Sequence, residues 1–294
     1  MHLHEHEGKK AFVIVVLNVV ITVSEVVAGI LSGSLALVSD ALHNLSDVLA
    51  VVLSFGARAI ARRDSTSTHT YGYKRAEVLA AFVNALVLLG VAVLVGREAI
   101  VRLLSPVPVG GWVMIVVGGI TFLANGLSTV LLHHEAQESL NMRSSYLHLF
   151  ADTLFSLVVV IGGVILLWKP IFWLDPVLSL VIVVYIVKES WQVVKHTVDI
   201  LMQAAVPVDY EVLQRTLEGV GGVKNVHHVH TWRTDEKTFY FEAHVEMEDC
   251  MLSSACEIGQ QIETRLKDFG FSHVTLQYET DRCREKDFFV KKKS

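Results

Sequence analysis

The chain has 294 residues, of which 52% are hydrophobic and 19% charged, and its formal net charge is −5. A soluble domain usually carries about 25% charged residues, so this chain has few charges for a water-exposed surface of its size. The acidic balance argues against a nucleic-acid partner, which would require a basic face. Together with a mean hydropathy of +0.47, these values indicate an integral membrane protein.

The cysteines indicate a reducing compartment. All three lie in the last fifth of the chain, and they form neither a C-x-x-C pair nor an even-numbered disulfide framework. We therefore expect free thiols that face a cytosol. The first apolar run lacks a small-residue cleavage site, so we expect no cleavable signal. The cysteines are Cys250, Cys256 and Cys283.

Residues 11–200 are predicted to form a membrane domain of six helices. Six apolar segments in this range are each long enough to cross about 30 Å of hydrocarbon as a helix. Lys and Arg cluster before the first segment and between the second and third, so the positive-inside rule places both termini in the cytoplasm. The predicted segments lie near 11–31, 36–60, 77–103, 111–133, 143–168 and 173–198.

From Val206 onward the sequence pattern changes to that of a small α+β domain. Residues 206–280 show the order αββαβ, with helices expected on one face of the sheet. Asp209 is a candidate N-cap of the first helix, and two alternating stretches around "DEK" predict a hairpin. The second helix is expected over residues 253–269, and "SHVTLQYE" is the last strand. Residues 281–294 are predicted to form a mobile tail.

Two histidines lie well inside apolar segments, and each is followed four residues later by an aspartate. Positions i and i+4 share one face of a helix. Ionisable groups at bilayer depth are costly and usually functional. Two such helices packed together would bring two imidazoles and two carboxylates to one point, a ligand set that suits tetrahedral Zn²⁺. The two pairs are His43 with Asp47 and His148 with Asp152.

A single His-x-x-x-Asp occurs often by chance, and a buried histidine is usually a hydrogen-bonded core residue. Two copies of the pair at the same spacing favour a functional site.

Other buried polar groups have simpler interpretations. Asp40 lies one turn before His43, and we favour an indirect or helix-packing role over metal ligation. Glu25 is expected to form interhelical hydrogen bonds, with a role as a pathway carboxylate as the alternative.

Several longer stretches resemble the cation diffusion facilitator family of divalent-metal transporters. They are "SGSLALVSDALHNLSDVLAV", "YGYKRAEVLAAFVNAL" and "LNMRSSYLHLFADTLFSLVVVIGGV". "HVHTW" and "HVTLQYE" are similar to the cytoplasmic domain of the same family. The resemblance covers residues 10 to 280 and points to the zinc-transporting branch. His43, Asp47, His148 and Asp152 match that branch's metal-ligand positions one for one.

The resemblance implies a homodimer that exchanges a metal ion for protons and carries the metal out of the cytoplasm or into an organelle. We expect the ion to be Zn²⁺ and the membrane to be a bacterial plasma membrane. Physical chemistry independently favours proton coupling, because metal ligands must be deprotonated and therefore bind either metal or protons. Histidine titrates near neutral pH, with a reference pKa of about 6.5. Imidazole ligands suit transition metals, and Zn²⁺ is the expected substrate. A regulatory Zn²⁺ is also expected.

Further metal sites are implied by the resemblance. Relatives dimerise through the cytoplasmic domain, and many bind regulatory metal there; the alternative is a set of surface histidines on a dimerising sheet. The matching positions are His227, His244, His273 and Glu279, with Cys256 as a further candidate.

Two more sites are weaker candidates. Some relatives bind metal in the loop that holds Asp64 and His69, but here Tyr73 stands where another histidine would help. Residues 1–10 form a His-rich cytoplasmic N-terminus, which either collects metal or is part of an expression tag.

Three rival functions remain open at this point. The same fold can carry another transition metal, such as Co²⁺, Ni²⁺ or Cd²⁺. A membrane metal sensor would bind without flux, although a sensor has no need of ligands at mid-bilayer. An intramembrane metalloenzyme would need a general base beside the metal. No H-E-x-x-H appears, and "LHHEAQE" has the wrong spacing, so we expect a transporter and not an enzyme.

Overall fold

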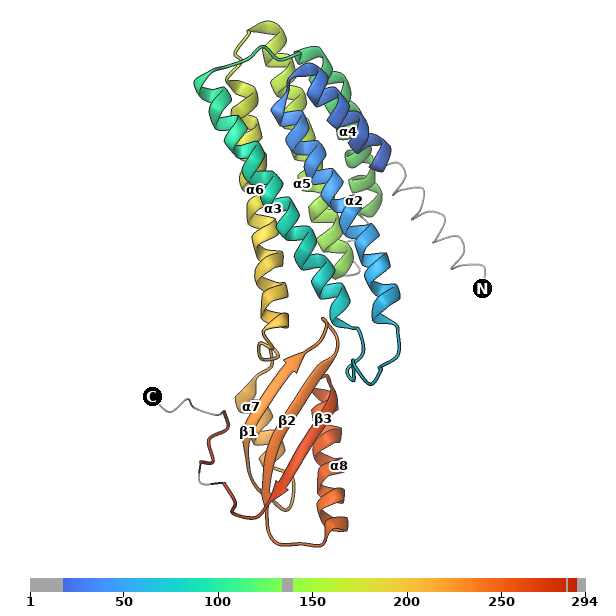
Figure 1. Cartoon of the computed structure of the whole chain (residues 1–294), viewed down its shortest axis with the longest axis vertical. Helices are drawn as coiled ribbons and strands as arrows, with labels where there is room; N and C mark the ends of the chain where they lie inside the picture. The colour runs from blue at the N-terminus through green and yellow to red at the C-terminus, as the bar shows by residue number, and fades with distance from the viewer. Residues whose placement is uncertain (1–17, 134–139, 284, 290–294) are drawn as a thin grey trace, which may run out of the picture. The chain divides into compact units, whose positions relative to one another are not determined.

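The computed structural model of the chain describes residues 18–133, 140–283 and 285–289, and it divides into two compact units. One unit, which spans 1–56 and 80–194, is a bundle of helices. The other unit combines 57–79 with 195–294 and contains the small C-terminal domain. Figure 1 shows the elements of both units with their labels.

Within the described residues, five helices are long and apolar enough to cross a membrane. A shorter apolar helix, Asn18–Ser32, precedes them, and residues 11–17 of the first predicted segment lie outside the described residues. The expected membrane α-helical fold is confirmed. The long helices are α2 (Leu35–Ala61), α3 (Arg75–Leu104), α4 (Gly111–Leu132), α5 (Leu140–Trp168) and α6 (Leu174–Leu201).

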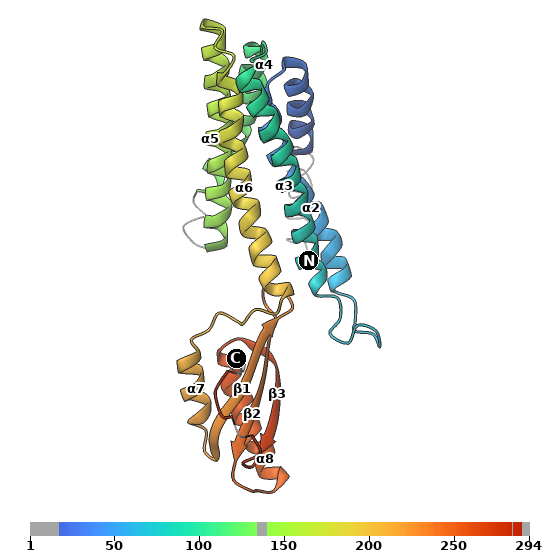
Figure 2. The same ribbon diagram turned by 60° about the vertical axis from the view of Figure 1, so that its left-hand side comes forward.

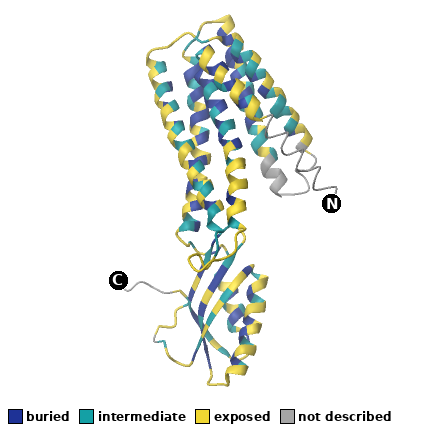
Figure 3. Cartoon of the chain, turned by 45° about the vertical axis from the view of Figure 1, so that its right-hand side comes forward, coloured by how far each residue is buried: buried dark blue, intermediate teal, exposed yellow. Residues whose placement is uncertain are grey.

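The helices of the bundle bury small and aliphatic side chains and leave large apolar side chains on the outside. Figure 3 shows the buried residues gathered on the inner faces of the helices. Exposed apolar side chains on this scale suit a lipid surface, since a water-facing bundle would carry charged residues there. The outer side chains include Phe55, Leu94, Ile120 and Val184, and the inner ones include Leu37, Met114, Val159 and Ile182.

Helices α4 and α5 approach each other closely at a pair of glycines, which have no side chains to keep the backbones apart. A Cβ atom on Gly163 of α5 would lie 2.8 Å from the carbonyl oxygen of Gly111 on α4, so only glycine fits there. Small residues of this kind let membrane helices approach closely. On the other side of the bundle, α3 and α6 lie side by side in both views (Figures 1 and 2).

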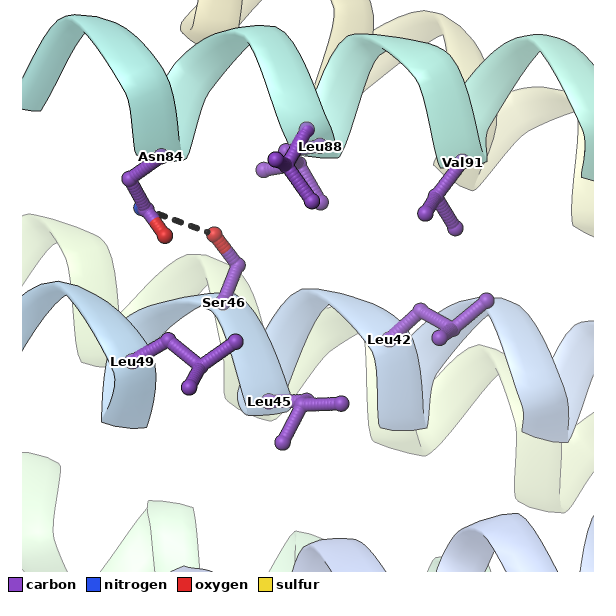
Figure 4. Close-up of a pocket in the computed structure, with 8 residues that line it drawn as sticks. Leu42, Leu45, Ser46, Leu49, Asn84, Leu88 and Val91 are labelled. Carbon is purple, nitrogen blue, oxygen red and sulfur yellow. Dashed lines mark hydrogen bonds between the residues drawn. The ribbon is translucent and has the colours of Figure 1, made fainter.

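A polar contact and a set of leucines hold α2 against α3. Asn84 Nδ2 donates a hydrogen bond to Ser46 Oγ over 3.3 Å (Figure 4). The bond satisfies two polar groups that lipid could not satisfy. The apolar side chains around it are Leu42, Leu45, Leu49, Leu88 and Val91.

The first turn of α2 is capped by a carboxylate from another helix. Asp175, at the start of α6, accepts hydrogen bonds from the Ser34 hydroxyl at 2.5 Å, the Leu35 amide at 2.7 Å and the Ala36 amide at 3.2 Å. These amides belong to the unpaired donors that begin every helix, and a negative charge there also complements the helix dipole. Asp175 therefore sets where α2 starts and hence where its ligands lie.

The C-terminal domain has the predicted order αββαβ. Strand β2 pairs antiparallel with β1 and parallel with β3, so the sheet order is β1-β2-β3. Asp209 caps the first helix as expected, through the amides of Glu211 and Val212. The elements are α7 (Tyr210–Glu218), β1 (Val223–Arg233), β2 (Phe239–Met247), α8 (Leu252–Asp268) and β3 (Phe271–Glu279).

One face of this sheet packs on both helices. Alternate residues of β2 enter the core, where Leu213 and Leu217 of α7 and Ile262 and Leu266 of α8 cover them. The other face is left for polar residues such as His244. Residues 285–289, which fall in the predicted mobile tail, lie along β1 in this structure: the Val229 amide donates to the Phe288 carbonyl at 2.8 Å. Residues 290–294 are outside the described part.

Replacement of Asp175 by Ala should loosen the start of α2. The change leaves buried donors without an acceptor, at a cost of roughly 1–3 kcal/mol for each unsatisfied group. We expect faster hydrogen–deuterium exchange at residues 34–38 of the intact protein than in wild type. Asp64→Ala, at an exposed loop position, is the matched control. Unchanged exchange in Asp175→Ala would show that the cap contributes nothing to helix stability.

Candidate metal centres

Helices α2 and α5 bring four metal-binding side chains together inside the bundle. The ligand atoms of His43, Asp47, His148 and Asp152 all lie within 4.8 Å of one another. Each helix contributes one histidine and, one turn later, one aspartate on the same face. These are the four residues that the sequence singled out.

The four side chains pair across the two helices. His43 Nε2 lies 3.0 Å from Asp152 Oδ1, and His148 Nε2 lies 3.2 Å from Asp47 Oδ2. The contacts within each helix are longer, at 3.8 Å for His43 with Asp47 and 3.7 Å for His148 with Asp152. Each histidine therefore has an aspartate from the other helix as its nearest partner.

These separations fit one tetrahedral ion. A tetrahedral Zn²⁺ with ligands at about 2.0–2.1 Å places neighbouring ligand atoms about 3.3 Å apart. The four histidine–aspartate distances, 3.0, 3.2, 3.7 and 3.8 Å, bracket that value. The remaining separations are within 4.8 Å, so all four groups lie close enough together to be candidates for binding a single ion. Two imidazoles in the set favour a transition metal over Mg²⁺ or Ca²⁺.

One side of this centre is buried and the other is open. His43 and Asp152 are each 4% exposed, whereas the side chains of Asp47 and His148 are 41% and 39% exposed. An ion that enters from the Asp47–His148 side meets two accessible ligands first and two buried ligands last. This geometry suits a site that loads and unloads.

Neighbouring polar groups support the centre without joining it. Ser156 Oγ lies 3.3 Å from Asp40 Oδ2 and 3.0 Å from the Asp152 carbonyl, so Asp40 is tied to α5 near the ligands. Glu25 accepts hydrogen bonds from Asn44 Nδ2 at 2.9 Å and from the Thr121 hydroxyl. Both carboxylates thus have the interhelical roles favoured from the sequence.

His69 is not part of a comparable cluster. Its Nδ1 lies 3.0 Å from Thr68 Oγ1, and its ring stacks on Tyr73 with centroids 4.5 Å apart. Across the described part of the chain, no group of three or more candidate ligands includes His69. The structure therefore gives the predicted loop site no ligand set. His2, His4 and His6 lie outside the described residues.

A second cluster of ligands lies on the polar face of the C-terminal sheet. It contains His227, His228, His244 and Cys283, whose ligand atoms also lie within 4.8 Å of one another. Glu279 contacts this cluster, with oxygens 3.0 Å from His227 Nε2 and 3.3 Å from both His244 Nδ1 and Cys283 Sγ. Three imidazoles and a thiolate are typical Zn²⁺ ligands.

His227 is the most deeply buried member of this cluster. Its residue is 0% exposed, and Asn225 Oδ1 lies 2.8 Å from its Nδ1. The Nε2 atom, although close to Glu279, is out of line for a hydrogen bond and has no hydrogen-bond partner among the described residues. Such an orphaned buried nitrogen is costly, and a metal ion would satisfy it.

The backbone at His228 explains how two adjacent histidines reach one cluster. Consecutive residues of a regular strand point to opposite faces. Here the β1–β2 register shifts between His227 and His230, and His228 has a φ of 50°. The bulge turns the His228 ring to the same side as His227. A non-glycine residue in this left-handed region is strained, and such strain concentrates at functional sites.

The charges in the cluster shape its acid–base behaviour. Burial lowers the pKa of His227, as do the rings of His228 and His244, and Glu279 opposes them. Burial would raise the pKa of Glu279. Hydrogen bonds from Cys283 and the electrostatic effect of His227 and His244 outweigh burial and bring this pKa below its ordinary value. Burial and the contact with Glu279 raise the pKa of the Cys283 thiol.

The structure brings together only some of the residues predicted for this site. His273 pairs in register with Tyr240, and its ring lies against that tyrosine. It is therefore four residues along the strand from Gln277, the partner of His244, or about 13 Å away. Cys256 is an exposed residue of α8, the helix that covers the opposite face. Neither residue joins the cluster, and the sequence did not identify His228 or Cys283.

Comparison with known families covers both units. The family model of the cation efflux transmembrane domain matches residues 11–202. The model of the cation efflux protein cytoplasmic domain matches residues 205–281. The matched ranges contain both candidate metal centres apart from Cys283.

Individual relatives align over almost the whole chain. The zinc transporter ZitB of Escherichia coli (strain K12) is 37% identical over 273 residues, which is 90% of this chain and 84% of the relative. The metal cation efflux system protein CzcD of Cupriavidus metallidurans is 32% identical over 292 residues, 97% and 92% respectively. The cadmium, cobalt and zinc/H(+)-K(+) antiporter of Bacillus subtilis (strain 168) is 30% identical over 286 residues, 95% and 92%.

Replacement of His228 by Asn should separate metal binding from stability. Asn tolerates the left-handed backbone but lacks the ring. We expect unchanged thermal unfolding and a Zn²⁺ affinity of the C-terminal cluster that is at least about tenfold weaker. Isothermal titration in an Asp47→Ala/Asp152→Ala background, which removes two of the four membrane ligands, measures it. His230→Asn, an exposed site on the same strand, is the control, and equal affinities in the two variants would contradict the assignment.

Proposed function

The chain belongs to the cation diffusion facilitator family, and on that premise we propose that the divalent metal cation it exports is Zn²⁺, carried in exchange for protons. The protein is a multi-pass membrane transporter of divalent metal cations. The identity of the ion, the proton coupling and the residues that bind the ion are the parts that we infer.

The observation that carries the proposal is the reciprocal pairing of two histidines and two aspartates between α2 and α5. Four nitrogen and oxygen ligands at tetrahedral separations match the preference of Zn²⁺. Mg²⁺ and Ca²⁺ prefer all-oxygen sites with more ligands, so the imidazoles select against the abundant cellular cations.

The same pairs explain why protons can replace the metal. Bound Zn²⁺ requires neutral imidazoles and ionised carboxylates. When the ion leaves, protonation of His43 and His148 would turn each cross-helix contact into a charge-assisted hydrogen bond. The emptied centre then holds paired charges, which avoids bare carboxylates at bilayer depth. Alternation between metal-loaded and proton-loaded states is the basis of antiport.

Other transition metals are the alternative substrate within the same mechanism. Co²⁺, Ni²⁺ and Cd²⁺ also bind imidazole and carboxylate ligands. The Bacillus subtilis relative is described as an antiporter for cadmium, cobalt and zinc, whereas the Escherichia coli relative is described as a zinc transporter. We expect Zn²⁺ to be favoured here, because the ligand set is tetrahedral and lacks a soft thiolate.

We also propose that the C-terminal cluster binds a regulatory Zn²⁺ and that the chain works as a homodimer. Support for the metal comes from the unsatisfied Nε2 of His227 and the strained backbone of His228. Support for the dimer is the resemblance to family members that dimerise through this domain. The cluster lies outside the membrane segments, so it reports metal concentration without lying on the transport path.

Transport is tested by Zn²⁺ uptake into proteoliposomes under an imposed pH gradient. Wild type should show flux that follows the gradient. Asp47→Ala and His148→Ala should each lower it more than about 100-fold, since loss of even an outer partner of a metal ligand often costs 10–100-fold. Asp64→Ala and His196→Ala remove the same side-chain types elsewhere and should retain wild-type flux.

Three outcomes would contradict the proposal or a part of it. Undiminished flux in Asp47→Ala and His148→Ala would make the membrane pairs structural. Zn²⁺ binding without any flux in wild type would favour a sensor. Equal rates for Zn²⁺, Co²⁺, Ni²⁺ and Cd²⁺ would overturn the zinc preference alone.

Metal binding by the C-terminal cluster should weaken as the pH falls. The ion must displace the proton of the Cys283 thiol, whose pKa is raised, so affinity drops about tenfold per pH unit for each proton displaced. Cys283→Ala should remove one proton from this dependence. Zinc titrations between about pH 8 and about pH 6, in the Asp47→Ala/Asp152→Ala background, measure the slopes. Identical slopes with and without the thiol would exclude Cys283 as a ligand.

A further inference from the structure

A cavity of about 560 Å³ lies within the unit that combines residues 57–79 with residues 195–294. The loop between α2 and α3 forms one wall, and the end of α6 and strand β1 complete it. Its lining shares no residue with either metal centre. The residues that matter below are Tyr71, Tyr73, Lys74, Arg75, Trp232 and Thr234.

The cavity is positively charged. Lys74 and Arg75 line it, and none of the described residues that line it is Asp or Glu. The Lys74 ammonium donates to the Thr238 hydroxyl at 3.2 Å, and that hydroxyl donates in turn to Asp235 Oδ2 at 2.8 Å. Among the described residues, neither cation has a carboxylate within ion-pair distance. The charge is therefore available to an anion, and the absence of carboxylates argues against a metal cation.

Two buried polar groups at the cavity have no hydrogen-bond partner among the residues that the structure describes. Thr234 is 4% exposed, and its hydroxyl makes no hydrogen bond within the described part of the chain. The Arg75 Nε is likewise buried and unpaired among the described residues. Buried donors without acceptors are rare and costly. Both atoms are shielded from solvent in this structure, so an oxyanion in the cavity would accept hydrogen bonds from them only after a small side-chain rotation.

The aromatic side chains around the cavity contact one another in the absence of a ligand. Tyr71 contacts Tyr240 edge-on with centroids 5.5 Å apart, and Trp232 stacks on Tyr240 at 5.2 Å. His69 and Tyr73 stack on each other on the loop side. A preformed cavity with aromatic walls and a few convergent polar groups is typical of a ligand site.

The source of the anion follows from the helices that end here. Helix α3 begins at Arg75 and α6 ends at Leu201, and both are long and apolar enough to cross a membrane. The ends of such helices meet lipid headgroups, and basic pockets there bind anionic lipid. Leu79 and Leu201 supply apolar lining beside the two cations. We propose that the cavity binds the phosphate group of an anionic phospholipid, with Lys74, Arg75 and Thr234 as its ligands.

The proposal is tested by native mass spectrometry of the full chain with dioleoyl phosphatidylglycerol or dioleoyl phosphatidylcholine. Wild type should retain phosphatidylglycerol in preference to phosphatidylcholine. Lys74→Gln/Arg75→Gln should weaken its retention at least about tenfold, because charge-assisted hydrogen bonds are the strong ones. Arg62→Gln/Arg63→Gln, an equal change in charge at exposed loop residues, should match wild type.

Thr234→Val keeps the shape of the side chain and removes only the hydroxyl, so it tests the site without the charge change. It should weaken phosphatidylglycerol retention about fivefold while the unfolding temperature stays that of wild type. Equal retention in wild type, Lys74→Gln/Arg75→Gln and Thr234→Val would overturn the proposal. So would loss of retention in the Arg62→Gln/Arg63→Gln control to the same degree.

Inorganic phosphate separates a lipid from a soluble anion. Millimolar phosphate that raises the unfolding temperature of wild type but not of Lys74→Gln/Arg75→Gln, with no phosphatidylglycerol retained, would overturn the lipid source. Retained phosphatidylglycerol that phosphate does not displace supports it. Both readouts are independent of zinc flux, so the result stands apart from the proposed transport function.

Discussion

The pairing of histidine with aspartate between α2 and α5 is the interaction on which the membrane unit depends. Each ionisable group sits at a depth where an unpaired charge would be expensive. His43 meets Asp152, and His148 meets Asp47, so the nearest partner of each histidine lies on the other helix. The two helices must therefore pack together, and the rest of the bundle holds them in register. Asp175 sets the start of α2, and Gly163 lets α4 lie close to α5.

Much of the membrane unit could be predicted because its signals are local. Span length follows from bilayer thickness, and a ligand pair at i and i+4 needs only a helix to share one face. The order αββαβ also followed from periodicity, since β2 alternates apolar residues that enter the core. His43 and Asp152 lie 109 positions apart, yet matching chemistry on two helices made their meeting predictable.

The membership of the C-terminal cluster could not be predicted from local sequence patterns. Two adjacent histidines point to opposite faces of any regular strand, so the inclusion of His228 depends on a bulge and a left-handed residue. Cys283 lies beyond the last strand, and its Sγ lies 3.4 Å from His244 Nδ1 and 3.3 Å from Glu279 Oε2. His273 lies away from the cluster because β3 runs parallel to β2 and pairs His273 with Tyr240, four residues before His244. Register and bulges are set by tertiary packing, which one sequence does not reveal.

Zinc K-edge X-ray absorption tests most directly whether the cross-helix pairs hold one tetrahedral ion. The sample is the full chain with His227→Ala, His244→Ala and Cys283→Ala, which removes the competing cluster. The account predicts one Zn²⁺ with four nitrogen and oxygen ligands at about 2.0–2.1 Å and no sulfur. Six oxygen ligands, or a spectrum unchanged by Asp152→Ala, would show that zinc binds elsewhere and would contradict it.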